Sequence, residues 1–314
     1  MRVAVFGAGG VGGYFGGRLA QAGEDIFFIA RGDHLRAMRE HGLRVDSIKG
    51  DFVIHPAQAT DDPAEIGIVD AVLVCVKAWD VPAAAQAMRP MIGPETFVVP
   101  LENGVEAPEQ LVGTLGAEHV LGGLARIISA IVGPGHIRHS GIEPYVAFGE
   151  LDRRPSERVE RLRQAFARAQ GVTVEVPPDI RVAMWDKFLF IAGVSGVGAV
   201  TRAPAGIFRS IPPTRQLLEQ VLSEIFAVAR ARDIALPADS VAKTMAYIDT
   251  LPPNGTSSMQ RDIIAGRPSE LDYQNGTVVR LGQELGVATP ANAFIYASLL
   301  PQEQRARGQV QFSI

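Results

Sequence analysis

Three glycines near the N-terminus have the spacing that a dinucleotide pyrophosphate requires. They follow the apolar run 3–6 and lead into a stretch whose apolar residues recur every three or four positions. In this pattern the first glycine permits a tight turn, the second lets the backbone approach the phosphates, and the third allows close helix–strand packing. The helix start adds free N–H groups and partial positive charge. We predict dinucleotide binding by Gly7, Ala8, Gly9, Gly10, Val11 and Gly12; the alternative is a glycine-rich turn in a non-binding α/β fold.

The choice between the two nicotinamide dinucleotides depends on the residues around the second predicted strand, 25–30. An NAD site usually has an acidic residue at the end of this strand, where it binds the ribose 2′-hydroxyl. Here Glu24 and Asp25 lie at the start, and the end carries Arg31. Because a guanidinium is a permanent cation suited to a phosphate, we predict NADP(H). Asp33 keeps NAD(H) open as an alternative.

Two further polar residues follow the next predicted strands. Lys77 comes after the apolar run 69–76, and Asn103 after 96–101. Ligands of an open α/β sheet lie outside the carboxyl ends of its strands. We therefore predict that Lys77 contacts a ribose hydroxyl, phosphate or substrate carboxylate, and that Asn103 orients the nicotinamide end or the substrate carbonyl. Each could instead be a surface or turn residue.

The second half of the chain supplies three further candidates. Lys187 lies at the edge of the apolar stretch 188–200, where it either reaches solvent or serves a site. Ser258 and Glu270 are polar groups of the kind needed beside a small anionic substrate and a lysine. The structural alternatives are a helix N-cap for a serine and a first-turn acid for Glu270.

These residues require two domains to position them. Apolar runs alternate with helical patterns up to about residue 176, which predicts a Rossmann-type, doubly wound parallel sheet. Beyond Pro177-Pro178 nothing indicates a strand, so we predict an all-helical domain. The predicted domains are 1–178, which binds the cofactor, and 179–314, which binds the substrate and carries the catalytic residues. Predicted helices of the second domain are about 180–200, 213–232, 239–249, 257–265, 271–285 and 290–300.

Composition excludes several classes of partner. The net charge is −4 with no long basic run, which argues against nucleic-acid or membrane-surface binding. The single cysteine, Cys75, excludes an internal disulfide and fits a reducing cytoplasm; we expect it to be a small buried strand residue. We expect no signal peptide, no membrane span and no metal site.

Taken in order, the motifs resemble those of the ketopantoate reductases (2-dehydropantoate 2-reductases) over essentially the full length. The matching residues are Gly7-Ala8-Gly9-Gly10-Val11-Gly12, Arg31, Lys77-Ala78-Trp79, Asn103-Gly104, Trp185-x-Lys187, Ser257-Ser258-Met259-x-x-Asp262 and Glu270-Leu271-Asp272-Tyr273-x-Asn275-Gly276.

The resemblance implies NADPH-dependent reduction of a 2-keto acid to a 2-hydroxy acid, with 2-dehydropantoate, converted to pantoate in pantothenate biosynthesis, as the first candidate substrate. It implies that Lys187 is the general acid and that Glu270 lies near the nicotinamide ribose and assists catalysis. Asn103 would touch cofactor and substrate, and Ser258 would bind the substrate. Family members are often dimeric, so a homodimer is possible.

The chain departs from the family at three positions. Family asparagines one and two turns after the catalytic lysine correspond here to Ile191 and Ser195, and a further one corresponds to Ala205. Losing a hydrogen-bonding group from a buried substrate hydroxyl or carboxylate costs about 1–3 kcal/mol. Ser195 remains a predicted substrate-binding residue. The alternatives are a less polar keto acid, a different substrate type such as a 3-hydroxy acid or an imine, and a non-catalytic NADP-binding regulator.

Overall fold

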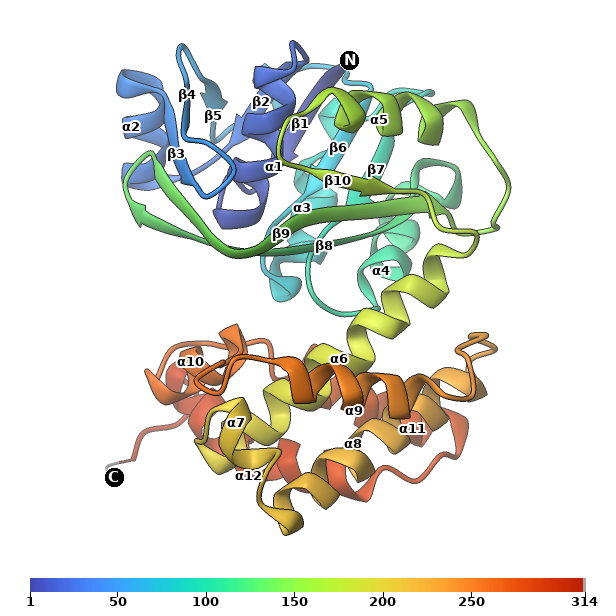
Figure 1. The fold of residues 1–314 in the computed structure, drawn as a ribbon. Helices are drawn as coiled ribbons and strands as arrows, with labels where there is room; N and C mark the ends of the chain where they lie inside the picture. Colours follow the sequence, from blue (N-terminus) through green and yellow to red (C-terminus); the bar gives the residue numbers. More distant parts are fainter. Residues whose placement is uncertain (313–314) are drawn as a thin grey trace. The chain divides into compact units, whose positions relative to one another are not determined.

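The computed structural model describes residues 1–312, which divide into two compact units (Figure 1). The first unit contains Met1–Glu102 and Glu106–Ala183. The second contains Asn103–Val105 and the chain from Met184 onward. The sequence did not anticipate that three residues after the last strand of the first sheet would belong with the helices.

A five-stranded parallel sheet forms the centre of the first unit. Its order is β5-β2-β1-β6-β7, and every neighbouring pair is parallel, so the predicted Rossmann-type sheet is confirmed. Its strands are β1 (Arg2–Phe6), β2 (Asp25–Ile29), β5 (Gln58–Thr60), β6 (Ala71–Val74) and β7 (Phe97–Pro100). The sequence did not predict β5, because three residues without an apolar run give no periodic signal.

The side chains of β1 point alternately to the two faces of the sheet and so divide the apolar core of this unit into two clusters. Val3 and Val5 belong to one apolar cluster, and Ala4 and Phe6 to the other, because successive strand residues point to opposite faces. The first cluster includes residues of α1 (Gly10–Gln21) and α5 (Glu157–Arg168), and the second those of α3 (Val81–Ala87) and α4 (Ala107–Leu115). The remaining helices of this unit are α2 (Gly32–His41), η1 (Pro63–Glu65), η2 (Ala78–Asp80), η3 (Arg89–Met91) and η4 (Ala117–His119).

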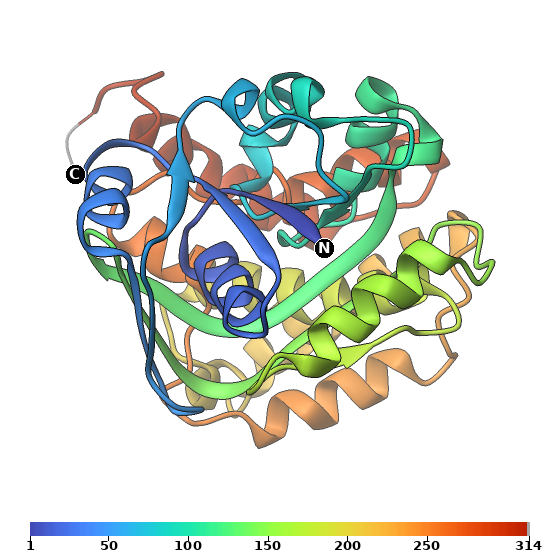
Figure 2. The same ribbon diagram turned by 90° about the horizontal axis from the view of Figure 1, so that it is seen from above.

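The first unit also contains a second sheet, which the sequence patterns do not separate from the parallel one. The glycine-rich region forms a long antiparallel hairpin that curves past α1 (Figure 2). The last strand, Thr173–Glu175, pairs with this hairpin rather than with the parallel sheet. A hairpin around Lys49-Gly50 is also present, and its first strand pairs with β9. The strands are β3 (Leu43–Ser47), β4 (Phe52–Ile54), β8 (Leu121–Gly133), β9 (His136–Glu150) and β10 (Thr173–Glu175).

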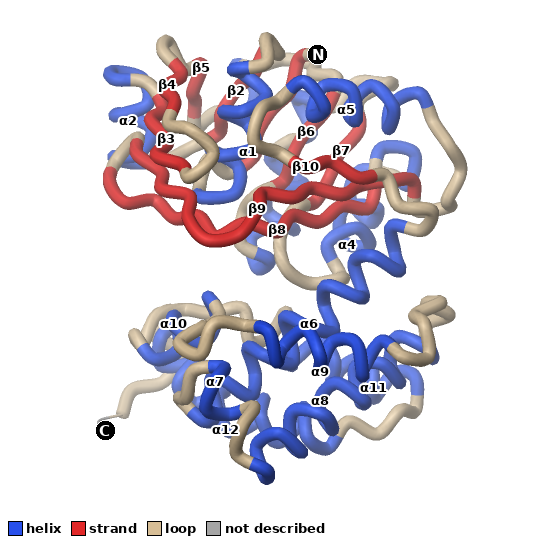
Figure 3. Tube along the Cα trace, viewed as in Figure 1, coloured by secondary structure: helices blue, strands red, loops and turns tan. Residues whose placement is uncertain are grey.

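The second unit is helical throughout its described residues, as predicted (Figure 3). Its helices are α6 (Ile180–Thr201, which starts in the first unit), α7 (Ala205–Phe208), α8 (Pro212–Ala231), α9 (Ser240–Thr250), α10 (Ser258–Ile264), α11 (Asn275–Leu285) and α12 (Pro290–Ala306). Two boundaries differ from the sequence prediction. Residues 271–274 form a turn before α11, and α12 continues through Pro301 to Ala306.

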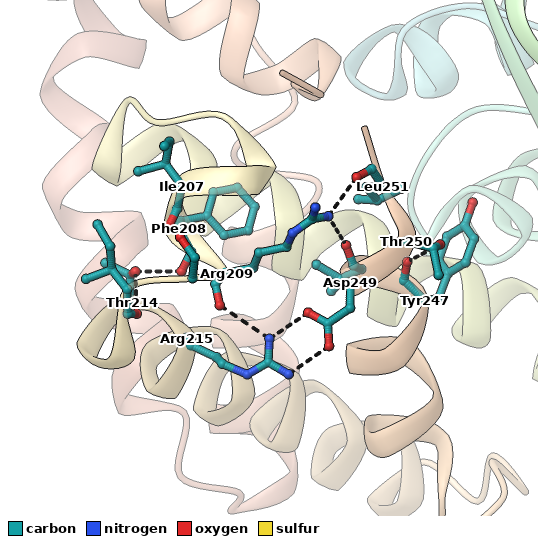
Figure 4. A network of polar contacts seen from close by, with 12 residues as sticks. Ile207, Phe208, Arg209, Thr214, Arg215, Tyr247, Asp249, Thr250 and Leu251 are labelled. Carbon is teal, nitrogen blue, oxygen red and sulfur yellow. Dashed lines mark hydrogen bonds and ion pairs between the residues drawn. The ribbon is translucent and has the colours of Figure 1, made fainter. Parts of the chain in front are cut away.

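Polar contacts fix several helix ends in this unit. Thr289 directly precedes α12, but its side chain accepts no capping hydrogen bond. The buried carboxylate of Glu224 accepts from the backbone N–H groups of Ala291 and Asn292 instead, at 2.8 and 2.9 Å. At the end of α9, Arg215 donates two hydrogen bonds to Asp249 (Figure 4).

The helix α6 is long and apolar enough to cross a membrane by length and composition, with a mean hydropathy of 1.3 over its best window. However, 67% of that window is buried inside the protein. A core helix of a soluble protein has this combination of properties.

Candidate active site

The glycine loop between β1 and α1 is shaped by two close approaches of the backbone. Gly7 has a φ of +100°, and its N–H and that of Ala8 both donate to the carbonyl oxygen of Ile29, at 3.1 and 3.0 Å. At Gly12, a Cβ atom would lie 2.2 Å from the carbonyl oxygen of Gly7. These two positions therefore require glycine for the turn and for helix–strand packing.

Gly9 differs from both of them, because nothing in the protein requires a glycine there. Its φ of −76° and ψ of −159° are extended values that any residue adopts, and a Cβ atom would meet no atom within 4 Å. The following helix has no side-chain cap and no acidic residue in its first turn. Open space beside uncapped N–H groups suits a pyrophosphate, so the shape of the loop is compatible with a dinucleotide.

His34 ties this loop to its surroundings, and sequence reasoning missed it. Its Nε2 lies 2.9 Å from the carbonyl oxygen of Ala8, and its Nδ1 accepts from the N–H of Gly135 at 3.0 Å. The proton must therefore be on Nε2. Burial lowers the pKa of His34, which favours the neutral ring that this pair of hydrogen bonds requires. A histidine in a helix such as α2 carries no signal in the sequence for this role.

The predicted cofactor-selecting residues occupy distinct environments. Arg31 is an exposed residue directly before α2. Asp33, the residue that would favour NAD, forms an ion pair with Arg36. Glu24 is buried and holds the N-terminal amine and Arg168, so its role is structural. Arg31 is thus better placed than either acid for a ribose substituent.

Lys77 and Cys75 follow β6 closely. Lys77 is exposed, and its Nζ lies 5.6 Å from the ring centroid of Trp79. Cys75 is half-buried beyond the end of β6 rather than a strand residue. Burial and the charge of Glu102 raise the pKa of its thiol, so the protonated, unreactive form prevails at neutral pH.

Asn103 and Glu270, which are 167 residues apart in the sequence, meet in the second unit. The Nδ2 of Asn103 donates to Oε2 of Glu270 at 3.2 Å. Glu270 is 4% exposed and Asn103 is half-buried. Because Glu270 lies in a turn before α11, it is not the first-turn helix acid that we considered as an alternative. The carboxylate takes one N–H of the amide, and the other N–H and Oδ1 remain for ligands.

Lys187 lies half-buried on α6, in the same unit as Asn103 and Glu270. By helical spacing, Ile191 and Gly198 lie on the same face of α6 as Lys187. A Cβ atom at Gly198 would lie 2.7 Å from Oε1 of Gln260 in α10. The face that carries Lys187 therefore continues towards the helix that begins at Ser258.

The paired serines before α10 have separate roles. Ser257 is the N-cap, and its side chain accepts from the N–H of Gln260 at 3.1 Å. Ser258 is the first helical residue and is half-buried. The capping alternative thus applies to Ser257 and leaves the Ser258 hydroxyl available for a ligand.

The three positions of departure from the family pattern differ in accessibility. Ile191 is half-buried, whereas Ser195 and Ala205 have exposed fractions of 0% and 1%. The Ser195 hydroxyl has no hydrogen-bond partner among the described residues. Substrate contact by Ser195 stays a prediction, and Ile191 is the accessible substitution.

Comparison with known proteins identifies the family. The family described as Ketopantoate reductase PanE/ApbA matches residues 3–153, and its C-terminal counterpart matches residues 179–303. An uncharacterized oxidoreductase of Bacillus subtilis is 32% identical over 95% of this chain and 98% of its own length. A 2-dehydropantoate 2-reductase of Caulobacter vibrioides is 31% identical, covering 95% of this chain and 97% of its own.

A solved structure agrees with these relatives. The crystal structure of a PanE/ApbA family ketopantoate reductase from Ralstonia eutropha has a TM-score of 0.89 and 34% identity, and the match covers 98% of this chain and 100% of that one. Both domains and their order are thus accounted for by a single family. The chain belongs to the ketopantoate reductase family of oxidoreductases.

Proposed function

We propose that this protein reduces a 2-keto acid to a 2-hydroxy acid with NADPH. The observation that carries the proposal is the pairing of Asn103 with Glu270 in the unit that also holds Lys187. The open backbone at Gly9 supports the cofactor, and the single half-buried cysteine fits a cytoplasmic location.

Lys187 is the group suited to deliver the proton. The chain has four lysines and 26 arginines, and an arginine cannot act as an acid at neutral pH because its pKa exceeds about 12. A lysine ammonium both stabilises a developing alkoxide and gives up a proton to it. When bound, a reduced nicotinamide supplies the hydride, so the protein has to align and protonate the substrate.

The neighbouring side chains orient this reaction. Asn103 has an N–H left over for the carbonyl oxygen once Glu270 has taken the other. Glu270 holds the amide and offers its second oxygen to a ribose hydroxyl. Ser258, at the start of α10, can donate to the substrate carboxylate.

A second candidate substrate is favoured by Ile191. The family suggests 2-dehydropantoate, which carries a hydroxyl on its side chain. Ile191, half-buried on the Lys187 face of α6, offers that hydroxyl no hydrogen bond. A keto acid with a branched, purely apolar side chain suits this surface better.

Replacing Lys187 tests the reaction. We expect Lys187→Ala to lower kcat by roughly 10²- to 10⁴-fold, the usual effect of losing a general acid, with the Kd for NADPH nearly unchanged. Steady-state NADPH oxidation over a panel of 2-keto acids, together with fluorescence titration of NADPH, measures both. Lys243→Ala removes an exposed lysine of α9 that pairs with Asp239 and is the control. Near-normal turnover by Lys187→Ala would refute the assignment.

Replacing Arg31 tests the cofactor. Loss of a charge-assisted contact of about 1.5–3 kcal/mol should raise the KM for NADPH roughly 10- to 100-fold and leave the KM for NADH unchanged. Arg36→Ala removes another exposed arginine of α2 and should leave the preference for NADPH intact. Equal effects of Arg31→Ala on the two cofactors would contradict a 2′-phosphate contact.

Ile191 is tested with two substrates that differ only in the hydroxyl, 2-dehydropantoate and 3,3-dimethyl-2-oxobutanoate. An apolar wall discriminates weakly against a missing hydroxyl, whereas a site built to bind one rejects the analogue strongly. We expect the wild type to reduce 3,3-dimethyl-2-oxobutanoate at least as efficiently as 2-dehydropantoate. We expect Ile191→Asn to shift the ratio of the two kcat/KM values about 10-fold towards 2-dehydropantoate. A wild-type preference for 2-dehydropantoate above about 100-fold would favour the first candidate instead.

A further inference from the structure

The last helix, α12, contacts the segment that contains Glu270 through two of its side chains. Glu303 binds the residue before Glu270, and Tyr296 binds the second residue after it. We propose that Glu303 and Tyr296 are positioning residues that fix the Glu270 carboxylate for catalysis. The proposal rests on the role of Glu270 in the proposed reaction.

Every polar atom of Ser269 makes a hydrogen bond, and two of them bind Glu303. Its N–H lies 3.0 and 3.1 Å from the two carboxylate oxygens of Glu303, and its hydroxyl donates to Oε2 at 2.5 Å. The same hydroxyl accepts from the N–H of Leu271 at 3.2 Å, and the Ser269 carbonyl accepts from Arg307 at 2.9 Å. The residue before Glu270 therefore has little freedom to rotate.

The carboxylate that makes this contact is itself held in place. Glu303 is 2% exposed, and Nε of Arg307, one turn later in α12, donates to its Oε1 at 2.6 Å. A buried carboxylate is costly unless it is paired and hydrogen-bonded. Here all its contacts are directed at the segment that leads into Glu270 or at the arginine that also binds that segment.

The second contact lies two turns earlier on the same face of α12. The hydroxyl of Tyr296 donates to Oδ1 of Asp272 at 2.7 Å, and Arg280 donates to the Asp272 carbonyl at 3.0 Å. Burial and the hydrogen bond to Asp272 raise the pKa of Tyr296 to about 12, so this donor keeps its proton at any physiological pH. The N–H of Tyr273 donates to the Glu270 carbonyl at 3.1 Å and closes the turn.

Both contacts act on residues that flank Glu270 and leave the Glu270 side chain to Asn103. The described hydrogen bonds of Glu303 are with Ser269 and Arg307, and that of Tyr296 is with Asp272. An effect of these residues on turnover would therefore pass through the position of Glu270. This separates them from catalytic residues.

The test compares Glu303→Gln with Glu224→Gln. Both are buried carboxylates that bind backbone N–H groups, but Glu224 caps the start of α12 and its described hydrogen bonds are with Gln220, Ala291 and Asn292. We expect Glu303→Gln to lower kcat roughly 10- to 100-fold, because small displacements of an aligned group cost that much, with KM for NADPH little changed. Glu224→Gln should lower the unfolding temperature while kcat stays within about two-fold. Tyr296→Phe, a milder change, should lower kcat a few-fold.

A double-mutant cycle identifies the route of the effect. In the Glu270→Gln background, Glu303→Gln should cause no further loss of kcat if it acts through Glu270. Additive losses, or unchanged kcat in both Glu303→Gln and Tyr296→Phe, would overturn the proposal.

Hydrogen exchange provides a readout that does not depend on turnover. Amides of residues 269–274 should exchange faster in Glu303→Gln than in the wild type and in Glu224→Gln, as measured by mass spectrometry on the intact protein. If the wild type reduces no keto acid, the proposed function fails, and faster exchange confined to Glu303→Gln still supports the contact as a positioning device. Unchanged exchange in Glu303→Gln overturns it.

Discussion

The candidate site depends on the hydrogen bond between Asn103 and Glu270. Asn103 comes three residues after β7, the last strand of the parallel sheet, yet it belongs with the helical unit because its amide donates to a nearly buried carboxylate there. A buried carboxylate needs such a partner. The bond also fixes which way the amide points, since only its nitrogen can face the carboxylate.

Around that bond, the chain separates groups that hold the structure from groups left for ligands. Gly12 is packed against backbone, and Gly9 faces open space. Ser257 is the N-cap of α10, whereas Ser258 is its first residue and does not act as the cap. Glu24 is committed to the N-terminus and Arg168, while Arg31 stands exposed. In each pair two residues lie close in the sequence, and local geometry decides their roles.

Much of this arrangement could be predicted from the sequence. Apolar runs with short glycine turns predict the parallel sheet, and helical periodicity predicts a helical second unit, because both signals are local. The second sheet was not predictable in the same way, since β3, β9 and β10 pair over long separations and their strands carry mixed patterns. The turn at 271–274 was missed because its apolar residues fit a helical period, whereas contacts from Tyr296 and Arg280 keep it out of the helix.

The residues of the candidate site also divide into those with a local signal in the sequence and those placed by long-range contacts. Asn103 and Lys187 could be proposed from the sequence because each lies at the edge of an apolar run, and Ser258 and Glu270 because they lie in motifs that resemble those of the family. Motif spacing could not predict that His34 supports the glycine loop or that Glu303 supports the turn before α11. Those contacts join segments far apart in the chain, and a histidine or glutamate in an amphipathic helix is ordinarily a solvated residue.

The central claim is that hydride passes from NADPH to the keto carbon of a 2-keto acid on this protein. Incubating the wild type with NADPH carrying two deuterium atoms at C4 of the nicotinamide and with 3,3-dimethyl-2-oxobutanoate tests it directly. We predict a 2-hydroxy acid with one deuterium at C2, seen as a one-unit mass increase and loss of the C2 proton signal in the NMR spectrum. Oxidation of the cofactor without deuterium at C2 of any acid on a panel that includes 2-dehydropantoate, or no oxidation at all, would contradict it.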